Sequence, residues 1–284
     1  MKKILITGGS SYLGQHLVPI AARQNEICYT FFENDPFGLP YGERLDLRDG
    51  HSVMRLISGF QPEAIIHTAG SNRSPDMEAV IRLGAQHVTE AARRNGARLI
   101  HMSTDVVFDG QNAPYRETDP PSPIHDYGRA KAAAETIVGR WVDHVIVRTS
   151  LIYGLFIMDR STEWMSAALA EGRPVKLFDN QLRQPVWAET LCLACLELAS
   201  SNYCGILNVA GDQSVSRAYF GLKMFDWWGI DGRDLVEVGP SVSKWPLDTR
   251  LDLTVAKEIL TTPLLGIDQV LELAKTQPLR SNIN

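Results

Sequence analysis

Short apolar runs alternate with longer helical stretches along the first two thirds of this 284-residue chain. Buried strands are predicted at residues 3–7, 27–32, 63–67, 98–102 and 144–147, and helices at 12–24, 49–60, 75–95 and 126–140. Repeated strand–helix units of this length predict a doubly wound parallel sheet with helices on both faces. The predicted fold class is therefore α/β.

The alternation loosens beyond about residue 155, where helices at 162–171 and 189–200 are separated by irregular segments. We expect a first domain of residues 1–155, with returning segments near 180–210, and a smaller C-terminal lobe made mainly of residues 156–284. In open parallel sheets, ligands bind beyond the carboxyl ends of the strands. Five residues with small or hydroxyl side chains fall at such ends: Gly8, Ala69, Ser103, Thr104 and Ser150.

Composition excludes several classes of function. A net charge of −5 and a pI near 5.8 argue against nucleic acid as the main partner, because phosphate binding needs a basic face. No run approaches the roughly 20 apolar residues that span a bilayer, so we expect no membrane contact and a cytoplasmic protein. Cys192 and Cys195 lack a second pair of ligands, which predicts buried apolar cysteines without a metal or a disulfide.

The first strand runs into the glycine-rich turn Ile6-Thr7-Gly8-Gly9-Ser10-Ser11-Tyr12-Leu13-Gly14. Gly8 allows a tight turn, and Gly14 allows the following helix to pack close to the strand. The start of that helix presents free N–H groups and a positive dipole to a pyrophosphate. A strand, this turn and a helix in sequence predict a Rossmann-like dinucleotide site.

Two further positions bear on the cofactor. Asp46, just after a short predicted strand, could accept a hydrogen bond from an adenine amino group, although Asp49 explains part of this motif as a helix cap. NAD specificity usually needs an acid at the end of the second strand. Phe31 and Phe32 stand there, with the acid shifted to Glu33, and no arginine marks a 2′-phosphate site. Because no acid stands at the end of the second strand, the sequence slightly favours NADP(H) over NAD(H).

Tyr127 and Lys131 stand four residues apart in a predicted helix and therefore share one face. A free tyrosine titrates near pH 10, and a cation within about 4–6 Å favours the phenolate. The sequence therefore predicts that Lys131 lowers the pKa of Tyr127. Thr104 could hold a substrate oxygen beside the phenol while a nicotinamide exchanges a hydride.

These motifs together resemble those of the extended short-chain dehydrogenase/reductase superfamily, and within it the dTDP-4-dehydrorhamnose reductase-like group of the epimerase/dehydratase family. The resemblance covers almost the whole chain. Its most specific part is Ser-Thr-Asp-Val-Val-Phe-Asp-Gly at residues 103–110, close to the group's S-T-D-Y-V-F-D-G. Residues 7–14, 46–47, 67–70, 127–131 and 148–154 match further motifs of the superfamily.

The resemblance implies that Thr104, Tyr127 and Lys131 form the catalytic set. Tyr127 would donate a proton, Lys131 would bind the nicotinamide ribose, and hydride would reach a C4 keto carbon of a nucleotide-linked sugar. The cofactor-binding residues that it implies are Gly8, Ser10, Ser11, Tyr12, Leu13, Gly14, Asp46, Leu47, Thr68, Ala69, Gly70, Ser103, Tyr127, Lys131 and Ser150. It also implies a homodimer joined through residues 75–95 and 126–140.

Three positions depart from the family pattern. Ser11 replaces the middle glycine of the turn and is expected to crowd the pyrophosphate. Ile81 replaces an asparagine and removes a hydrogen-bonding side chain. Val106 replaces a tyrosine, which alters the substrate pocket, and because valine cannot ionise, it disfavours dehydration.

The substrate-binding residues predicted on the same grounds are Thr104, Asp105, Val106, Arg183 and Trp245. Arg183 could bind a diphosphate bidentately or be a surface arginine in a loop. Trp245 could stack on a base or a sugar or belong to the core.

Two alternative functions stay open. The departures at Ser11 and Ile81 would suit a non-catalytic protein that binds NAD(P) as a structural or regulatory ligand. The same keto intermediate would suit a C4 nucleotide-sugar epimerase that holds its cofactor tightly.

Overall fold

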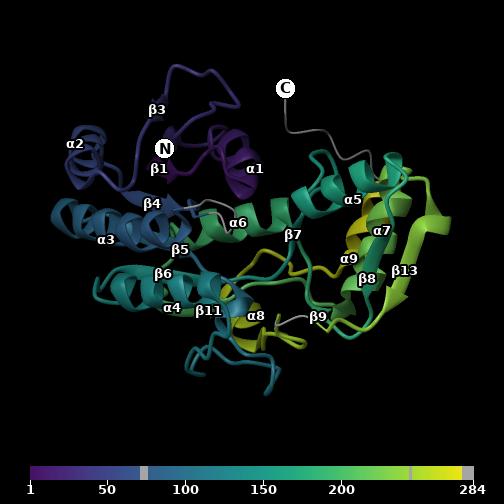
Figure 1. Cartoon of the computed structure of the whole chain (residues 1–284). Coiled ribbons are helices and arrows are strands. Elements are labelled where there is room, and N and C mark those ends of the chain that lie inside the picture. Colours follow the sequence, from purple (N-terminus) through teal and green to yellow (C-terminus); the bar gives the residue numbers. More distant parts are fainter. Residues whose placement is uncertain (71–75, 243–244, 277–284) are drawn as a thin grey trace.

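The central sheet of the computed structural model, which describes residues 1–70, 76–242 and 245–276, has seven parallel strands (Figure 1). They are β1 (Lys3–Thr7), β2 (Glu26–Phe31), β3 (Gly42–Arg44), β4 (Ala64–His67), β5 (Arg98–Met102), β6 (His144–Arg148) and β11 (Gly205–Asn208). Their order is β11-β6-β5-β4-β1-β2-β3. Because the order runs outward from β1 in both directions, the predicted doubly wound α/β fold is confirmed.

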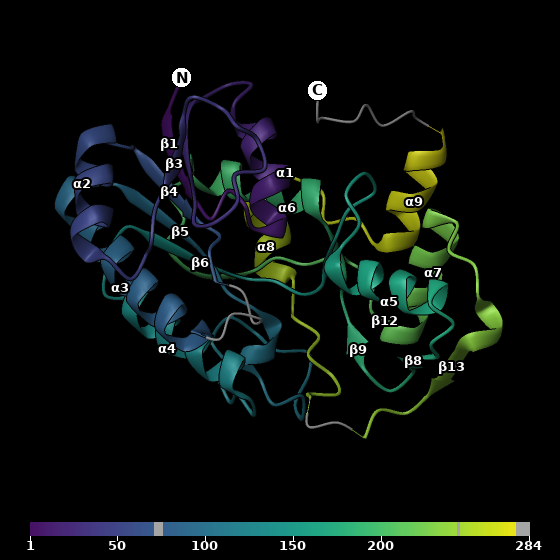
Figure 2. The same ribbon diagram turned by 45° about the horizontal axis from the view of Figure 1, so that its top comes forward.

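Helices cover both faces of this sheet (Figure 2). On one face, α2 (Gly50–Phe60), α3 (Met77–Asn95) and α4 (Asp126–Val138) bury apolar side chains against the strands. On the other face lie α1 (Tyr12–Ala21), α6 (Ala188–Leu198) and α8 (Thr254–Ile259). Side chains that alternate along each strand thus feed two separate cores. Cys192 and Cys195 are fully buried on α6, as predicted.

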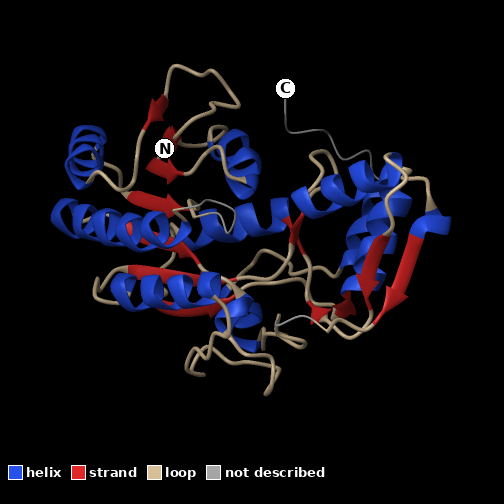
Figure 3. Cartoon of the chain, in the orientation of Figure 1, coloured by secondary structure: helices blue, strands red, loops and turns tan. Residues whose placement is uncertain are grey.

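The remaining elements form a smaller lobe beside the carboxyl edge of the sheet (Figure 3). Its helices are α5 (Arg160–Ala170), α7 (Arg217–Trp228) and α9 (Ile267–Thr276), with the short 3₁₀ helix η2 (Arg233–Leu235). Its strands pair as β8 (Val175–Phe178) with β13 (Val236–Gly239) and β9 (Leu182–Arg183) with β12 (Val215–Ser216). The pair β7 (Ile152–Tyr153) and β10 (Val186–Trp187) lies where the chain passes between the two parts. The exact domain limits stay a prediction.

Several helix ends follow local sequence rules. Asp49 caps α2 by accepting hydrogen bonds from the N–H groups of His51 and Ser52. α3 and α7 end at Gly96 and Gly229, whose φ angles of 64° and 61° favour glycine. The predicted start of the long helix at residue 75 lies outside the described residues.

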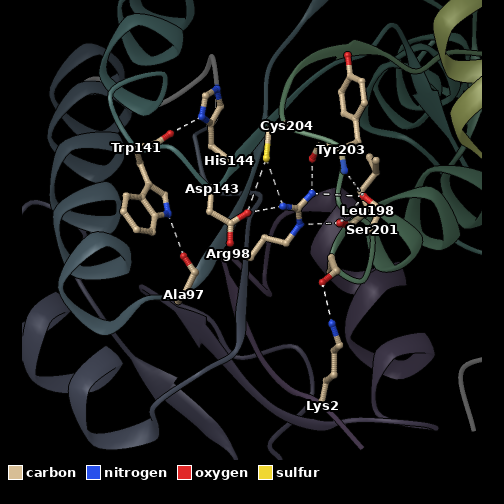
Figure 4. Close-up of polar contacts among 11 residues, drawn as sticks. Lys2, Ala97, Arg98, Trp141, Asp143, His144, Leu198, Ser201, Tyr203 and Cys204 are labelled. Carbon is tan, nitrogen blue, oxygen red and sulfur yellow. Dashed lines mark hydrogen bonds and ion pairs between the residues drawn. The ribbon is translucent and has the colours of Figure 1, made fainter.

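A buried arginine anchors the amino edge of the sheet, opposite the edge where ligands bind (Figure 4). The guanidinium of Arg98, the first residue of β5, donates to the carbonyl oxygen of Leu198 at the end of α6 at 2.8 Å, and to Tyr203 O. It also pairs with the carboxylate of Asp143. Because Arg98 satisfies carbonyls that a helix leaves open at its end, it holds α6 against the strands.

Within the described ranges, no helix is long and apolar enough to cross a bilayer. The same residues contain no group of three or more His, Cys, Asp or Glu side chains that could hold a metal ion. All four cysteines are free thiols, and Cys204 is the exposed one among them.

Candidate active site

Three adjoining cavities lie along the carboxyl edge of the sheet. We name them the outer cavity (about 530 Å³, with Gly8, Asp46 and Ala69), the central cavity (about 270 Å³, with Ser103 and Lys131) and the lobe cavity (about 530 Å³, with Asp105 and Arg183). The outer and central cavities share Ser11, Gly70 and Arg160. The central and lobe cavities share Thr104, Tyr127 and Ser150. An elongated ligand could therefore extend from the outer cavity to a reactive centre at Tyr127.

The structure gathers nearly all of the predicted site residues around these cavities. The outer cavity is lined by the predicted residues Gly8, Ser10, Ser11, Asp46, Leu47, Ala69 and Gly70. The central cavity adds Tyr12, Leu13, Thr68, Ser103, Thr104, Tyr127, Lys131 and Ser150, and the lobe cavity adds Asp105, Val106, Arg183 and Trp245. Gly14 lines none of them and packs beneath the turn. A larger cavity, about 790 Å³, opens between α2 and strands β2 and β3 and contains none of the predicted residues.

The glycine-rich turn is shaped by close backbone approaches. Gly8 has a φ of 81°, and a Cβ there would lie 2.7 Å from the backbone nitrogen of Ala69. A Cβ on Gly14 would lie 2.2 Å from the carbonyl oxygen of Gly8. Since only glycine fits at both positions, the turn presents the start of α1 as an anion site for a dinucleotide.

Ser11 does more than replace a glycine. Its hydroxyl accepts a hydrogen bond from the N–H of Gly14 at 3.0 Å and so caps α1. The same hydroxyl lies 2.9 Å from the hydroxyl of Thr68, which in turn donates to the carbonyl oxygens at Thr7 and Gly8. The side chain is thus part of the turn's hydrogen bonding, and one of the helix's free N–H groups is already used.

The outer cavity contains an arginine that the sequence analysis missed. Arg48 forms hydrogen bonds of 2.8–3.1 Å with both carboxylate oxygens of Asp46 and one of 2.6 Å with Asp76. Its guanidinium lies 5.7 Å from the ring centre of Phe32. The bonds from Arg48 hold the pKa of Asp46 below its usual range. Strand β3 pairs with β2 and sets Arg44 beside Phe31, so the segment after β3, which contains Arg48, begins next to the end of β2.

Tyr127 and Lys131 lie in the first turns of α4, whose start is capped by the ring nitrogen of His125 at 3.0 Å from the N–H of Gly128. The ammonium of Lys131 is buried, donates to the carbonyl oxygen of Met102 and lies 3.4 Å from Nε2 of His101. Burial lowers the pKa of Lys131 to about 8, against the opposing effect of Glu135.

The pKa of Tyr127 differs from the prediction. Burial, and then the charge of Asp105, raises it from its usual value near 10 to about 12. The expected lowering by Lys131 is therefore wrong for this structure, where burial sets the direction of the shift. The phenol of Tyr127 is therefore protonated at neutral pH.

The lobe cavity is built around buried charges. The carboxylate of Asp105 accepts hydrogen bonds from Ser150 at 2.7 Å and Thr249 at 2.8 Å, and lies 3.8 Å from Nε of Arg183. Arg183 is 3% exposed and donates to three carbonyl oxygens, at Leu182, Pro246 and Leu247. Arg183 is therefore not a surface arginine. Most of its donors are occupied within the protein, which leaves little for bidentate binding of a diphosphate.

Other side chains complete this cavity. Arg217, which the sequence analysis did not identify, lines it and donates to the hydroxyl of Ser161 at 3.4 Å. Trp245 is 43% exposed and packs on the ring of His125 with centroids 4.2 Å apart, so it is not a core residue. Val106 is buried in the wall. Aromatic and cationic groups of this kind suit a nucleotide or a sugar phosphate.

A buried polar layer lies next to Lys131. His67 forms a 2.6 Å hydrogen bond with Thr7, and its ring lies 5.1 Å from that of His101. Burial lowers the pKa of His67 to about 3, so both rings stay neutral at pH 7. The alignment of Thr7, His67 and His101 follows from the parallel register of β1, β4 and β5, which no local pattern reveals.

A second buried group joins Ser103 to the sheet. Its hydroxyl donates to Glu135 at 2.5 Å, and Glu135 forms a bidentate ion pair with Arg148 at 2.8–3.1 Å. Ser103 therefore lines the central cavity while its hydroxyl is engaged by α4.

The chain is similar in sequence and fold to several known proteins. Residues 1–265 match the model of the family described as "RmlD substrate binding domain". A dTDP-4-dehydrorhamnose reductase of Mycobacterium tuberculosis is 32% identical over 240 residues, which cover 81% of this chain and 77% of that protein. The structure of a hypothetical dTDP-4-dehydrorhamnose reductase from Sulfolobus tokodaii is 29% identical with a TM-score of 0.81, covering 94% of this chain and 97% of the other. A dTDP-4-dehydrorhamnose reductase from Bacillus anthracis, solved in complex with NADP, shares the fold at 23% identity, with a TM-score of 0.79 and coverage of 95% and 96%.

Proposed function

The chain belongs to the RmlD substrate binding domain family, and we propose that it reduces the keto group of a nucleotide-linked sugar with a nicotinamide cofactor. It is an oxidoreductase of the extended short-chain dehydrogenase/reductase type. The observation that supports the reaction best is the meeting of Thr104, Tyr127 and Lys131 at the junction of the central and lobe cavities. A protonated phenol stands there beside a buried lysine, which is what reduction of a carbonyl requires.

The turn at Gly8 and Gly14 fits a dinucleotide, because neighbouring backbone atoms lie so close to both residues that only glycine can stand there. A bound nicotinamide supplies the hydride. Tyr127 holds the proton that the new alcohol oxygen receives. Lys131 keeps a positive charge near the phenol, and this charge stabilises negative charge on the oxygen as the proton leaves.

Thr104 orients the substrate oxygen. Its hydroxyl accepts from the N–H of Val106 at 3.4 Å and donates to Asp105 at 3.3 Å, both long hydrogen bonds. A substrate carbonyl can therefore replace the bond to Asp105 at little cost. Ser150 and Thr249 continue to donate hydrogen bonds to the Asp105 carboxylate when that bond is lost.

We propose a preference for NADP(H) over NAD(H). Arg48 beside the ring of Phe32 supports it, together with Arg44, whose Nε donates to the carbonyl oxygen of Phe32 at 3.0 Å. Of these two cations, Arg48 lines the outer cavity with Phe32, where an adenosine ribose would reach the end of β2. We expect Arg48→Gln to weaken the binding of NADPH by roughly tenfold and to leave the affinity for NADH within twofold, as measured by fluorescence titration. Equal weakening of the binding of both cofactors would refute the proposed preference.

The lobe cavity supports a nucleotide sugar as substrate. Arg217 offers charge for a phosphate, and Trp245 offers a stacking surface for a base or a sugar. Family membership further supports a cytoplasmic enzyme and a homodimer through α3 and α4. Light scattering of the purified chain tests the dimer, and a monomer at micromolar concentration would exclude it.

The function is tested by turnover. Purified protein is mixed with NADPH or NADH and a 4-keto nucleotide sugar, and oxidation of the cofactor is followed at 340 nm. We expect Tyr127→Phe to lose at least 100-fold in kcat while keeping its affinity for the cofactor. Absence of turnover in wild type, or full activity in Tyr127→Phe, would refute the proposal.

The two alternatives receive less support. A regulatory dinucleotide-binding protein does not need the buried charge of Lys131, which costs stability at neutral pH. An epimerase would recycle its cofactor within each turnover. Stoichiometric oxidation of NADPH in the assay above therefore separates reductase from epimerase.

A further inference from the structure

The strongest unused feature near the site is the exposed side chain of Arg160, the first residue of α5. Arg160 comes from the smaller lobe, yet it lines both the outer and the central cavities. The other two residues common to these cavities are Ser11 and Gly70, which belong to the strand ends of the sheet. Arg160 therefore lines the junction of the two cavities as a residue of the smaller lobe.

The charges around this junction single out Arg160. Arg48, at the outer end, is bound to two carboxylates. Lys131, at the inner end, is bound to Met102 and His101. Arg160 forms no ion pair with any residue in the described part of the chain. It is thus an uncommitted cation at the middle of an elongated site.

A hydrogen bond between the two parts of the molecule holds the segment that carries Arg160. The hydroxyl of Tyr12, the first residue of α1, donates to the carbonyl oxygen of Ile157 at 2.8 Å. Gly154 lets the two segments meet closely, because a Cβ there would lie 2.7 Å from that same hydroxyl. Asp159 then caps α5 through the N–H groups of Ser161 and Thr162. The start of α5 is therefore held against the start of α1.

We propose that Arg160 clamps the pyrophosphate of the dinucleotide from the smaller lobe. This inference rests on the proposed function. In a turn with a glycine at position 11, the pyrophosphate would meet the free N–H groups at the start of α1. Here the hydroxyl of Ser11 already uses one of them, the N–H of Gly14. Arg160 supplies the charge and the paired donors that the turn has lost, and guanidinium geometry matches phosphate oxygens.

A diphosphate of the substrate is the competing ligand. The lobe cavity, where the substrate is expected, is lined by Arg183, Arg217 and Ser161, but not by Arg160. The position of Arg160 thus assigns it to the cofactor. The pyrophosphate lies between the adenosine and nicotinamide halves, as Arg160 lies between the outer and central cavities.

Binding experiments test this without turnover. NADPH, NADH, ADP-ribose and dTDP are titrated by calorimetry against wild type, Arg160→Gln, Arg160→Lys and the control Arg140→Gln. Arg140 is an exposed arginine beyond the far end of α4, so its variant has the same change in net charge away from the cavities. Circular dichroism confirms that each variant is folded, which an exposed position favours.

We expect Arg160→Gln to weaken the binding of NADPH, NADH and ADP-ribose by the same factor, roughly tenfold, and to leave the binding of dTDP unchanged. Arg160→Lys should lie between wild type and Arg160→Gln, and Arg140→Gln should bind as wild type. Added salt should weaken wild type more steeply than Arg160→Gln. If the tyrosine acts by positioning the arginine, the double variant Tyr12→Phe/Arg160→Gln should bind the dinucleotides about as weakly as Arg160→Gln alone.

Other outcomes overturn the assignment. Unchanged binding of all three pyrophosphate ligands by Arg160→Gln would exclude the clamp. Loss confined to NADPH would assign Arg160 to the 2′-phosphate, and loss confined to dTDP would assign it to the substrate. If wild type binds neither NADPH nor NADH, the proposed function fails and the clamp fails with it. Dinucleotide binding that is unaffected by Arg160→Gln would refute the clamp alone.

Discussion

Replacement of Lys131 by methionine should make the protein more stable while it abolishes turnover. The Lys131 side chain is 3% exposed, and no carboxylate hydrogen-bonds to its ammonium among the described residues. Burial lowers its pKa from an ordinary 10.5 to about 8. The folded protein therefore carries a buried charge at neutral pH at a cost in free energy. Methionine has a similar length, remains unbranched and removes that charge.

The size of the effect follows from the two pKa values. At about 1.4 kcal/mol per pH unit, their difference corresponds to roughly 3 kcal/mol of destabilisation below pH 8. The variant also loses the hydrogen bonds from the ammonium to Met102 and His101, which costs about 1 kcal/mol. We therefore expect Lys131→Met to raise the free energy of unfolding by about 2 kcal/mol at pH 7. A gain in stability on loss of a catalytic group is typical of a functional site.

Urea unfolding at pH 7 to 10.5 checks both the sign and the size. Between pH 8 and 10.5 the unfolded state of wild type binds more protons than the folded state, so wild-type stability rises with pH. The advantage of Lys131→Met should thus be complete below pH 8 and disappear by about pH 10.5. Lys223→Met is the control, because the bond to Asp268 raises the pKa of this half-buried lysine instead. A variant that is less stable at pH 7, or an advantage independent of pH, would refute the reasoning.

Three further predictions concern buried groups. Arg148→Met leaves Glu135 buried without its partner and should lower the free energy of unfolding by about 3–5 kcal/mol, measured in urea; a loss below 1 kcal/mol would contradict it. Gly14→Ala places a Cβ 2.2 Å from the Gly8 carbonyl oxygen and should abolish dinucleotide binding in a titration; wild-type affinity would disprove the tight turn. Burial lowers the pKa of His67, so wild-type stability should fall as pH drops below about 6.5, and His67→Gln should fall less between pH 7 and 5; equal losses would argue against a buried neutral ring.

The sheet and most of the site could be predicted because their signals are local. An apolar run, a turn and a helix in order determine a βα unit, and parallel strands bring their carboxyl ends to one edge. Tyr127 and Lys131 share a helix face through their spacing alone. These rules placed Gly8, Thr104 and Tyr127 at one edge of the sheet, where the structure has them.

The parts that sequence could not predict depend on contacts between distant segments. Arg183 looked equally like a surface residue because its burial depends on the carbonyl oxygens at Pro246 and Leu247, more than 60 residues away. Arg160 gains a role only because Tyr12 holds its segment, 145 residues further along the chain. The pKa of Tyr127 was predicted in the wrong direction for the same reason. Spacing reveals the neighbouring cation, but not how fully the fold buries the phenol.

The pKa values of Tyr127 and Lys131 suit the proton donation that we propose for reduction of a carbonyl. With pKa values of about 12 and 8, the phenol is protonated and the lysine is charged at pH 7. A carbonyl that accepts hydride needs a proton donor, and Tyr127 in this state is one. Oxidation of an alcohol would need the phenolate, whose formation costs several kcal/mol at pH 7 when the pKa is near 12. The burial that makes Lys131 costly to the fold also raises the pKa of Tyr127, so that in the proposed reaction the phenol stays protonated until a substrate oxygen receives the proton.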